Sequence, residues 1–376
     1  MTTNTSSDAV SDTDVLVLLG TTKGLFTLRS GDGRQHFELS GPTFPGEEVY
    51  STCIDTRSGA ARLFTGSVSN HWGPVLRRSD DLGESWTEDE EAALRFPESA
   101  DASLARIWQL TPGHGDEPEV LYAGVEPAAL FRSDDGGHSF SLVEGLWDHP
   151  HRPQWQPGGG GLCLHTVLVH PEDRQRLLIA ISAAGVYVSD DGGSSWRASN
   201  HGIIPGFLPE GEEIEFGQCV HKVARDAAQP ERLYLQHHGG IYRSDDGGGS
   251  WAPMTGIAGM DFGFPVVAHP SRPSTAYLLP LESDGFRCTP DGQCTVWRTN
   301  DAGETWEPLT DGLPQQDAHL TVLRDGFTTD GQDPAGLYFG TRTGELYAST
   351  DDGDSWQLLA QHLPPVLSVR AAPIAA

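Results

Sequence analysis

The chain has little of several features that particular protein classes need. Only Lys23 and Lys222 are lysines, and 24 basic residues face 53 acidic ones, which gives a net charge of −29 over 376 residues. A strongly acidic chain repels polyanions at long range, so neither a nucleic-acid partner nor an anionic membrane partner is expected. Five cysteines are too few for a disulfide scaffold in a chain this long. Cys288 and Cys294 flank a short turn and can form a local bridge, but we expect reduced thiols.

Long apolar runs are also missing. No window contains the roughly 20 apolar residues that a membrane-spanning helix needs. The first 13 residues are polar and acidic, without the basic and apolar regions of a secretory signal. We therefore expect a cytoplasmic protein with a disordered tail at residues 1–13. Helical periodicity is absent almost throughout, which leaves β-strands as the expected elements.

One short motif recurs along the chain. The pattern Ser/Thr-x-Asp-x-Gly-x-Ser/Thr-Trp/Phe returns about every 50 to 56 residues, at 79–86, 133–140, 189–196, 244–251, 299–306 and 349–356, with a degraded seventh copy at 30–37. Between the copies lie short runs rich in Val, Ile, Leu and Tyr, separated by turn residues, which predict antiparallel strands. Four strands repeated seven times predict an all-β, seven-bladed propeller as a single domain over residues 14–376.

The two ends of the chain predict how the ring closes. The first unit begins at residue 14 without a leading strand, whereas an unpartnered run, PPVLSVRAAPI, ends at residue 374. We expect this C-terminal run to become the innermost strand of the first blade, because that pairing leaves no open sheet edge.

The repeated motif resembles the Asp-box, or BNR repeat. Over residues 14–374 the chain resembles sialidase-like propellers, including bacterial propellers named glycosyl hydrolase or exo-sialidase and photosystem-assembly-factor-like propellers. The resemblance implies the propeller fold and is compatible with several functions. It also places the repeated loop between the third and fourth strands of each blade.

The repeated loop itself is predicted to be structural. Its aspartate and hydroxyl side chains can bond to nearby backbone, and its glycine can adopt a conformation that other residues avoid. A calcium loop would need further ligands and a phosphate loop would need a lysine, and neither is present.

Ligand chemistry is therefore expected at the central channel, on the opposite face. Aligned without a gap, two inner strands place Cys163 with Cys219 and His165 with His221. Because side chains alternate along a strand, Cys-x-His puts both side chains on one side. We expect the two histidines to approach each other across the channel mouth. The same alignment puts Tyr50, Arg106 and Phe264 at the equivalent position in other blades.

Several residue types at these positions suggest a metal-assisted or acid–base centre. Histidines that converge with carboxylates can bind Zn²⁺ or another divalent metal, although hydrogen-bonded structural histidines are the alternative. The candidate metal ligands are His71, His165, His221, His237 and His238. The candidate catalytic residues are His165, His221, Glu126 and Glu282, and the candidate substrate-binding residues are Tyr50, Trp72, Arg106, Trp108, Trp155, Lys222 and Arg342. Long insertions at 144–161, 200–217 and 281–294 are expected on the same face.

Three functions remain open from the sequence. The first is a hydrolase or lyase that acts at the channel on a small polar or carbohydrate-like substrate, with or without a metal. The second is a non-catalytic assembly or recognition propeller with a protein or glycan partner. The third, implied by the resemblance, is a retaining sialidase-type glycosidase with Tyr50 as its nucleophile and with Arg106 and Arg342 binding the substrate carboxylate. The Phe/Tyr-Arg-Ile-Pro motif of those enzymes is missing, and residues 20–30 read GTTKGLFTLRS instead.

Overall fold

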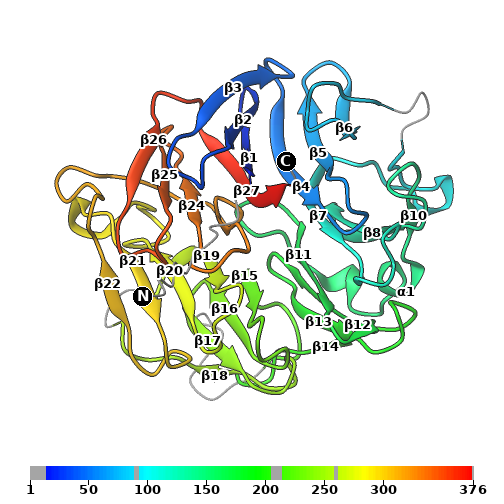
Figure 1. The fold of residues 1–376 in the computed structure, drawn as a ribbon. Coiled ribbons are helices and arrows are strands. Elements are labelled where there is room, and N and C mark those ends of the chain that lie inside the picture. The colour runs from blue at the N-terminus through cyan, green and yellow to red at the C-terminus, as the bar shows by residue number, and fades with distance from the viewer. Residues whose placement is uncertain (1–13, 89–92, 205–213, 258–260, 375–376) are drawn as a thin grey trace, which may run out of the picture.

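Seven antiparallel sheets surround a central axis like the blades of a propeller (Figure 1). The computed structural model describes residues 14–88, 93–204, 214–257 and 261–374, so the tail predicted at residues 1–13 lies outside the described residues. Within each of blades two to seven the chain runs from the innermost strand outward before it enters the next blade. The predicted all-β, seven-bladed propeller is confirmed.

The blades follow one another in chain order. From the inside outward, the first blade contains β27 (Val366–Ile374), β1 (Asp14–Thr21), β2 (Gly24–Ser30) and β3 (Glu38–Thr43), and the second contains β4 (Glu48–Asp55), β5 (Arg62–Ser69) and β6 (Gly73–Ser79). The third contains β7 (Arg106–Pro112), β8 (Leu121–Glu126), β9 (Ala129–Ser133) and β10 (Ser141–Leu142), and the fourth contains β11 (Leu164–His170), β12 (Asp173–Ile181), β13 (Gly185–Ser189) and β14 (Arg197–Ala198). The fifth contains β15 (Val220–Arg225), β16 (Leu233–His237), β17 (Gly240–Ser244) and β18 (Ala252–Pro253). The sixth contains β19 (Gly263–Ala268), β20 (Ala276–Pro280), β21 (Val296–Thr299) and β22 (Glu307–Leu309), and the seventh contains β23 (Phe327–Thr329), β24 (Leu337–Gly340), β25 (Leu346–Ser349) and β26 (Gln357–Ala360).

The second blade differs from the prediction of four strands. It has three strands in the described residues, with a single bridge between Arg78 and Thr87 where the fourth strand is expected. The other six blades have four strands each.

The described residues contain few helices, and all of them are short. They comprise α1 (Glu144–Trp147) and the 3₁₀ turns η1 (Glu98–Ala100), η2 (Arg152–Gln154) and η3 (Pro290–Gly292). None of the helices in the described residues is long and apolar enough to span a bilayer.

Strand β27 closes the ring as predicted. It pairs antiparallel with β1, from Asp14 opposite Ile374 to Thr21 opposite Val366, with one register shift near Gly20. Neighbouring inner strands then contact each other all the way round, in the order β4, β7, β11, β15, β19, β23 and β27. The N- and C-terminal segments therefore share one sheet, and their pairing closes the ring without leaving β1 as an open sheet edge.

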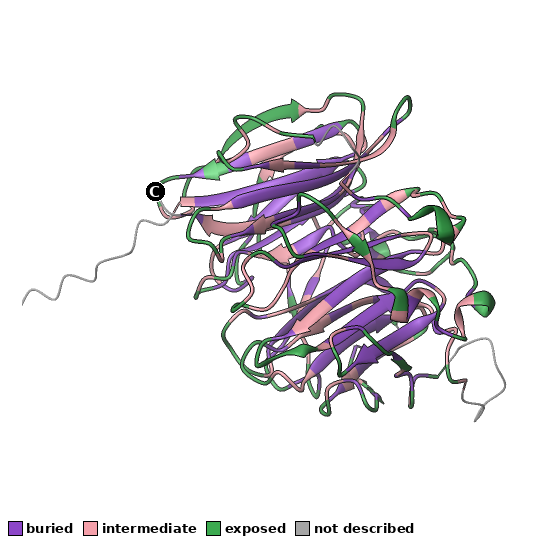
Figure 2. Ribbon diagram, turned by 90° about the vertical axis from the view of Figure 1, so that its right-hand side faces the viewer, coloured by how far each residue is buried: buried purple, intermediate pink, exposed green. Residues whose placement is uncertain are grey.

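The core lies between the blades. Figure 2 shows buried residues along the middle of the strands and exposed residues mainly in the loops at both ends. The second strands carry fully buried tyrosines at similar places, including Tyr122, Tyr234, Tyr277 and Tyr338. Such side chains bury a large apolar area while their hydroxyl groups need polar partners. Tyr338 Oη, for example, donates a hydrogen bond to Asp330 Oδ2 over 3.2 Å.

The repeated loop has the structural role that its sequence predicts. In residues 189–196, Ser189 Oγ donates to Asp191 Oδ1 over 2.8 Å, and Ser195 donates to Asp191 through both its amide and its hydroxyl. The degraded copy keeps this arrangement, because Asp32 Oδ1 accepts bonds from Ser30 Oγ and from the amide of His36 at 3.0 Å. Each aspartate thus fixes the conformation of its own loop. The loop of residues 189–196, for example, connects β13 to β14, the third and fourth strands of its blade.

Candidate functional site in the central cavity

A cavity of about 600 Å³ lies at the axis, on the face opposite the repeated loops. Its walls come from the beginnings of inner strands and from the connections between second and third strands, where the sequence predicts the site. The lining residues include Tyr50, Arg106, Trp108, Glu126, Gly159, Gly160, Gly161, Cys219, His221, His238, Phe262, Phe264, Arg287, Arg324, Asp325 and Arg342. Seven of the predicted site residues are among them: Tyr50, Arg106, Trp108, Glu126, His221, His238 and Arg342.

A β-bulge recurs near the start of the inner strands. The register shifts leave Tyr50 in β4, Trp108 in β7, His165 in β11 and His221 in β15 without a partner across the ladder. A bulge redirects the side chain that it carries, and here it turns Tyr50, Trp108 and His221 to the cavity. The residue equivalent to His221 in the third blade is therefore Trp108. The ungapped alignment placed Arg106 there and was wrong by two residues.

One wall of the cavity is an aromatic and charged cluster. Glu126 Oε2, at the end of β8, accepts hydrogen bonds from Arg106 Nη1 and from Trp108 Nε1, each over 3.0 Å. The Arg106 guanidinium lies 5.1 Å from the centre of the Tyr50 ring, and the Tyr50 and Trp108 ring centres are 5.2 Å apart. Tyr50 Oη donates to Glu48 Oε2 over 2.9 Å. Burial and the Glu48 carboxylate raise the pKa of Tyr50, while Arg106 lowers it in part.

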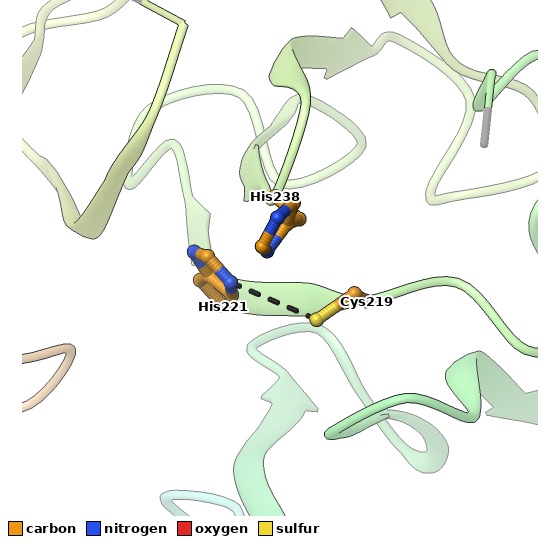
Figure 3. Close-up of side chains that lie close together, drawn as sticks. All are labelled: Cys219, His221 and His238. Carbon is orange, nitrogen blue, oxygen red and sulfur yellow. Dashed lines mark hydrogen bonds between the residues drawn. The ribbon is translucent and has the colours of Figure 1, made fainter. Parts of the chain in front are cut away.

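The cavity lining also contains a second cluster, made of Cys219, His221 and His238 (Figure 3). Their possible ligand atoms all lie within 4.8 Å of one another, and Cys219 Sγ is 3.7 Å from His221 Nε2. His221 Nδ1 is 2.6 Å from the carbonyl oxygen of Gly263 in the next blade. His238 extends from the turn after β16, where its Nε2 lies 3.3 Å from Asp284 Oδ2. We call these three residues the Cys-His-His cluster.

Burial controls the ionisation of this cluster. Burial and the nearby Arg324 guanidinium lower the pKa of His221 to about 3, so its imidazole is neutral at pH 7. Burial raises the pKa of the Cys219 thiol, and Arg324 offsets part of that rise. A neutral imidazole beside a protonated thiol is therefore the expected state of these two side chains at pH 7.

Arginines dominate the charge of the cavity. Four arginines and two carboxylates line it among the described residues. Arg106 is paired with Glu126, but Arg287, Arg324 and Arg342 have no carboxylate partner in the part of the chain that the structure describes. The Arg324 guanidinium lies 5.4 Å from the centre of the Trp108 ring, and its Nη1 donates to Cys163 Sγ. A chain of net charge −29 thus has an electropositive cavity at its axis.

The floor of the cavity is a buried ion network. Asp325 accepts hydrogen bonds from Lys222 Nζ, over 2.8 Å, and from the Arg370 guanidinium. Lys222 also donates to Gln109 Oε1 over 3.1 Å, so the network joins four different blades. Burial alone would raise the pKa of Asp325, but Lys222 and Arg370 lower it well below its usual range. Lys222 is thus bound across the channel by protein groups, and the substrate-binding role predicted for it is not supported.

His165 and His237 do not join the Cys-His-His cluster. His165 is fully buried, its Nε2 is 3.0 Å from the carbonyl oxygen of Val220, and its Nδ1 is 3.0 Å from Thr166 Oγ1. With both ring nitrogens used by the protein, His165 cannot also bind a metal ion or a substrate, which corrects the prediction for this residue. His237 is also buried, its Nδ1 accepts a bond from the Gly239 amide, and its side chain does not line the cavity.

The remaining predicted residues lie away from the cavity. Trp155 is a core residue whose Nε1 donates to Tyr187 Oη over 2.8 Å. Trp72 is 85% exposed at the tip of the β5–β6 turn, beside the exposed His71. Glu282 is exposed and does not line the cavity. The sequence does not show how far from the axis a loop residue lies. These four residues were therefore predicted to belong to the site although they lie away from it.

Two of the three long insertions contribute residues to the cavity lining. Insertion 144–161 reaches the cavity through Gly159, Gly160 and Gly161, and insertion 281–294 supplies Arg287. Half of insertion 200–217, residues 205–213, lies outside the described residues. All five cysteines are free, including Cys288 and Cys294.

Sequence reasoning missed Cys219 and Arg324 as site residues. Cys219 was not among the predicted site residues, although the Cys-x-His spacing already placed it on the same side of the strand as His221. Arg324 precedes β23, whose short length leaves residues 320–326 largely irregular, so no strand pattern pointed to it.

No protein-family model matches the chain. A xyloglucanase of Hypocrea jecorina is 24% identical over 270 residues, which cover 65% of this chain and 30% of the relative. An oligoxyloglucan-reducing end-specific xyloglucanase of Emericella nidulans is 23% identical over 250 residues, which cover 66% of this chain and 26% of the relative. The chain thus spans less than a third of the length of these relatives.

Solved structures show the same fold. The GH74 xyloglucanase from Xanthomonas campestris superposes with a TM-score of 0.62 at 16% identity, covering 92% of this chain and 52% of that chain. YCF48 bound to D1 peptide superposes with a TM-score of 0.54 at 14% identity, covering 91% of this chain and 83% of that chain. At these identities the likeness shows the propeller architecture, as the sequence resemblance implies.

Proposed function

We propose that the chain is a hydrolase or lyase that acts in the central cavity on a small, anionic, carbohydrate-like substrate. The observation that carries this proposal is the set of three arginines, Arg287, Arg324 and Arg342, that face the cavity without a carboxylate partner among the described residues. Guanidinium groups bind carboxylate and phosphate oxygens through paired, charge-assisted hydrogen bonds. An acidic chain has no general reason to concentrate unpaired positive charge at one point, so a ligand anion is the natural partner.

The walls suit a sugar ring. Tyr50, Trp108, Phe262 and Phe264 line the cavity, and flat aromatic faces pack against the apolar faces of sugars. Glu126 can accept a proton from the substrate or from water, with Arg106 and Trp108 holding its carboxylate in place. The xyloglucanases that the chain resembles act on a carbohydrate by their names, which supports a carbohydrate-like substrate, while the arginines favour a charged one.

A second candidate, a sialidase-type retaining glycosidase, is favoured by one contact. Tyr50 Oη donates to Glu48 Oε2 over 2.9 Å and lines the cavity beside Arg106. A tyrosine assisted by a carboxylate is the nucleophile arrangement of sialidases. Under this mechanism Tyr50→Phe abolishes turnover and keeps ligand binding, whereas an acid–base mechanism through Glu126 survives that change.

The test is a cleavage assay with paired oligosaccharides, one series neutral and one containing uronic or sialic acids. We expect release of reducing ends from the anionic series only, and loss of activity in Glu126→Gln. Arg197→Met, which alters an exposed arginine of the outermost strand of the fourth blade, paired with Asp190, is the matched control and should keep full activity. Equal cleavage of both series would contradict the proposal. Binding of the anionic sugars without cleavage would identify a recognition propeller instead.

A further inference from the structure

The Cys-His-His cluster has the geometry of a metal site. In a tetrahedral zinc site, with Zn–S of about 2.3 Å and Zn–N of about 2.1 Å, a sulfur and a nitrogen ligand are roughly 3.6 Å apart. Cys219 Sγ and His221 Nε2 are 3.7 Å apart, and the cluster's candidate ligand atoms all lie within 4.8 Å of one another. An ion between them therefore needs only small side-chain adjustments.

The groups behind the cluster orient its ligand atoms. His221 Nδ1 donates to the Gly263 carbonyl over 2.6 Å, which leaves Nε2 unprotonated toward Cys219. His238 Nε2 lies 3.3 Å from the Asp284 carboxylate, so an ion in the cluster would be bound through Nδ1. A histidine with one nitrogen bound to a carbonyl or a carboxylate is the usual arrangement of a zinc ligand, because the partner fixes the tautomer and the ring orientation.

The backbone ties the ligands together. The amide of His238 donates to the carbonyl oxygen of Cys219 over 3.0 Å, which keeps the turn after β16 beside the start of β15. The His221 ring packs edge-to-face against His238 and against Phe262, with ring centres 5.6 Å and 5.4 Å apart. The three side chains are thus held in place from two strands of one blade, and all three line the cavity.

We propose that Cys219, His221 and His238 form a three-ligand Zn²⁺ site whose fourth coordination position opens into the cavity. One thiolate and two imidazoles are ligands that suit zinc, and three protein ligands with one open position are typical of catalytic rather than structural zinc. Bound zinc would polarise a substrate oxygen or activate water there, and that catalytic role rests on the proposed function. The binding of the ion does not.

The experiment uses the full chain without a histidine tag, treated with a chelator and then titrated with zinc chloride against a competing indicator. We expect about one zinc ion per chain. Even loss of a partner behind the ligands costs about 10- to 100-fold in affinity, so Cys219→Ser and His238→Gln should each weaken binding by at least about 100-fold. Cys288→Ser and His71→Gln, outside the cluster, are the matched controls and should bind like the unmodified chain.

Cobalt substitution identifies the thiolate ligand. We expect a sulfur-to-cobalt charge-transfer band in the unmodified chain and in Cys288→Ser, but not in Cys219→Ser. His238 is 42% exposed on its side chain, so His238→Gln should fold normally, which its thermal unfolding will show. No zinc binding by the unmodified chain, or unchanged affinity in both cluster variants, overturns the proposed site and leaves a thiol–imidazole contact. Zinc binding without cleavage of any anionic sugar would overturn the proposed function and keep the metal site.

Discussion

Arg324 is the residue whose charge the proposed anion site needs most. Its guanidinium lies between Trp108 and Cys163, and it has no carboxylate partner among the described residues. Arg324→Met keeps an unbranched side chain of similar reach and removes only the charge and the hydrogen-bond donors. We therefore expect this variant to fold like the unmodified chain and to lose affinity for anions.

The size of the loss follows from the position of Arg324. Two unit charges about 4 Å apart attract each other by about 4 kcal/mol at the effective dielectric of a protein surface, before desolvation is subtracted. Hydrogen bonds to charged groups contribute about 1.5–3 kcal/mol net. Because Arg324 is partly exposed, the hydrogen-bond range of about 1.5–3 kcal/mol is the better guide at moderate salt. A loss of that size raises Kd by about 10- to 150-fold.

The assay is isothermal titration calorimetry with glucuronic acid and glucose as matched probes. Glucuronic acid should bind more tightly than glucose, its affinity should fall as salt is added, and Arg324→Met should weaken glucuronic acid binding only. Arg197→Met controls for the loss of an arginine elsewhere on the surface. If glucuronic acid and glucose bind equally, or if Arg324→Met weakens both to the same extent, the unpaired arginines do not form an anion site.

Three further predictions concern the scaffold. Asp325→Asn leaves the partly buried Lys222 and Arg370 without their carboxylate partner and should lower the free energy of unfolding by about 3 kcal/mol, the lower end of the range for a broken buried ion pair, measured by urea denaturation at pH 7. Folding lowers the pKa of Asp325, so the ionised carboxylate stabilises the folded chain above the ordinary carboxyl pKa of about 4, and this stabilisation is lost as the pH falls below it. The Asp325→Asn variant lacks this group, so its free energy of unfolding should decrease less in acid than that of the unmodified chain. His165→Phe should cost about 1–3 kcal/mol of stability by leaving the Val220 carbonyl unpaired, with zinc affinity unchanged, and weaker zinc binding would return His165 to the site. Removal of residues 366–374 opens the edge of β1 and should abolish cooperative unfolding, and a sharp transition in the shortened chain would show that ring closure is dispensable.

The fold could be predicted almost completely because it depends on local, repeated features. Seven copies of one loop set the number of blades, and the missing first strand together with the extra last run specified the closure by β27. Even the degraded copy at 30–37 holds its loop as the others do, with His36 in place of a serine or threonine. That the described residues of the second blade form only three strands was not visible in the sequence, because strand length depends on packing at the rim rather than on the repeat.

The site was predicted only in outline. Its face and its axis followed from the position of the repeated loops, and half of the predicted residues line the cavity. The distance of a loop residue from the axis does not follow from sequence, which is why Trp72 and His71 were misplaced. The ion network of Lys222, Asp325 and Arg370 joins strands far apart in the chain, and no spacing rule connects them.

The two aligned histidines, His165 and His221, show most clearly why similar local sequences place their ring nitrogens in different surroundings. Both sit at a bulge, and both bind a carbonyl oxygen of the next blade, but His165 does so through Nε2 and His221 through Nδ1. His165 is followed by Thr166, whose hydroxyl engages the remaining nitrogen. His221 is followed by Lys222, which donates to Asp325 instead. Because Nδ1 of His221 bonds the carbonyl oxygen of the next blade, its Nε2 remains beside Cys219. The choice of the ring nitrogen that bonds the next blade therefore separates His165, with both nitrogens engaged by protein groups, from His221, whose Nε2 faces the cysteine of the proposed zinc site.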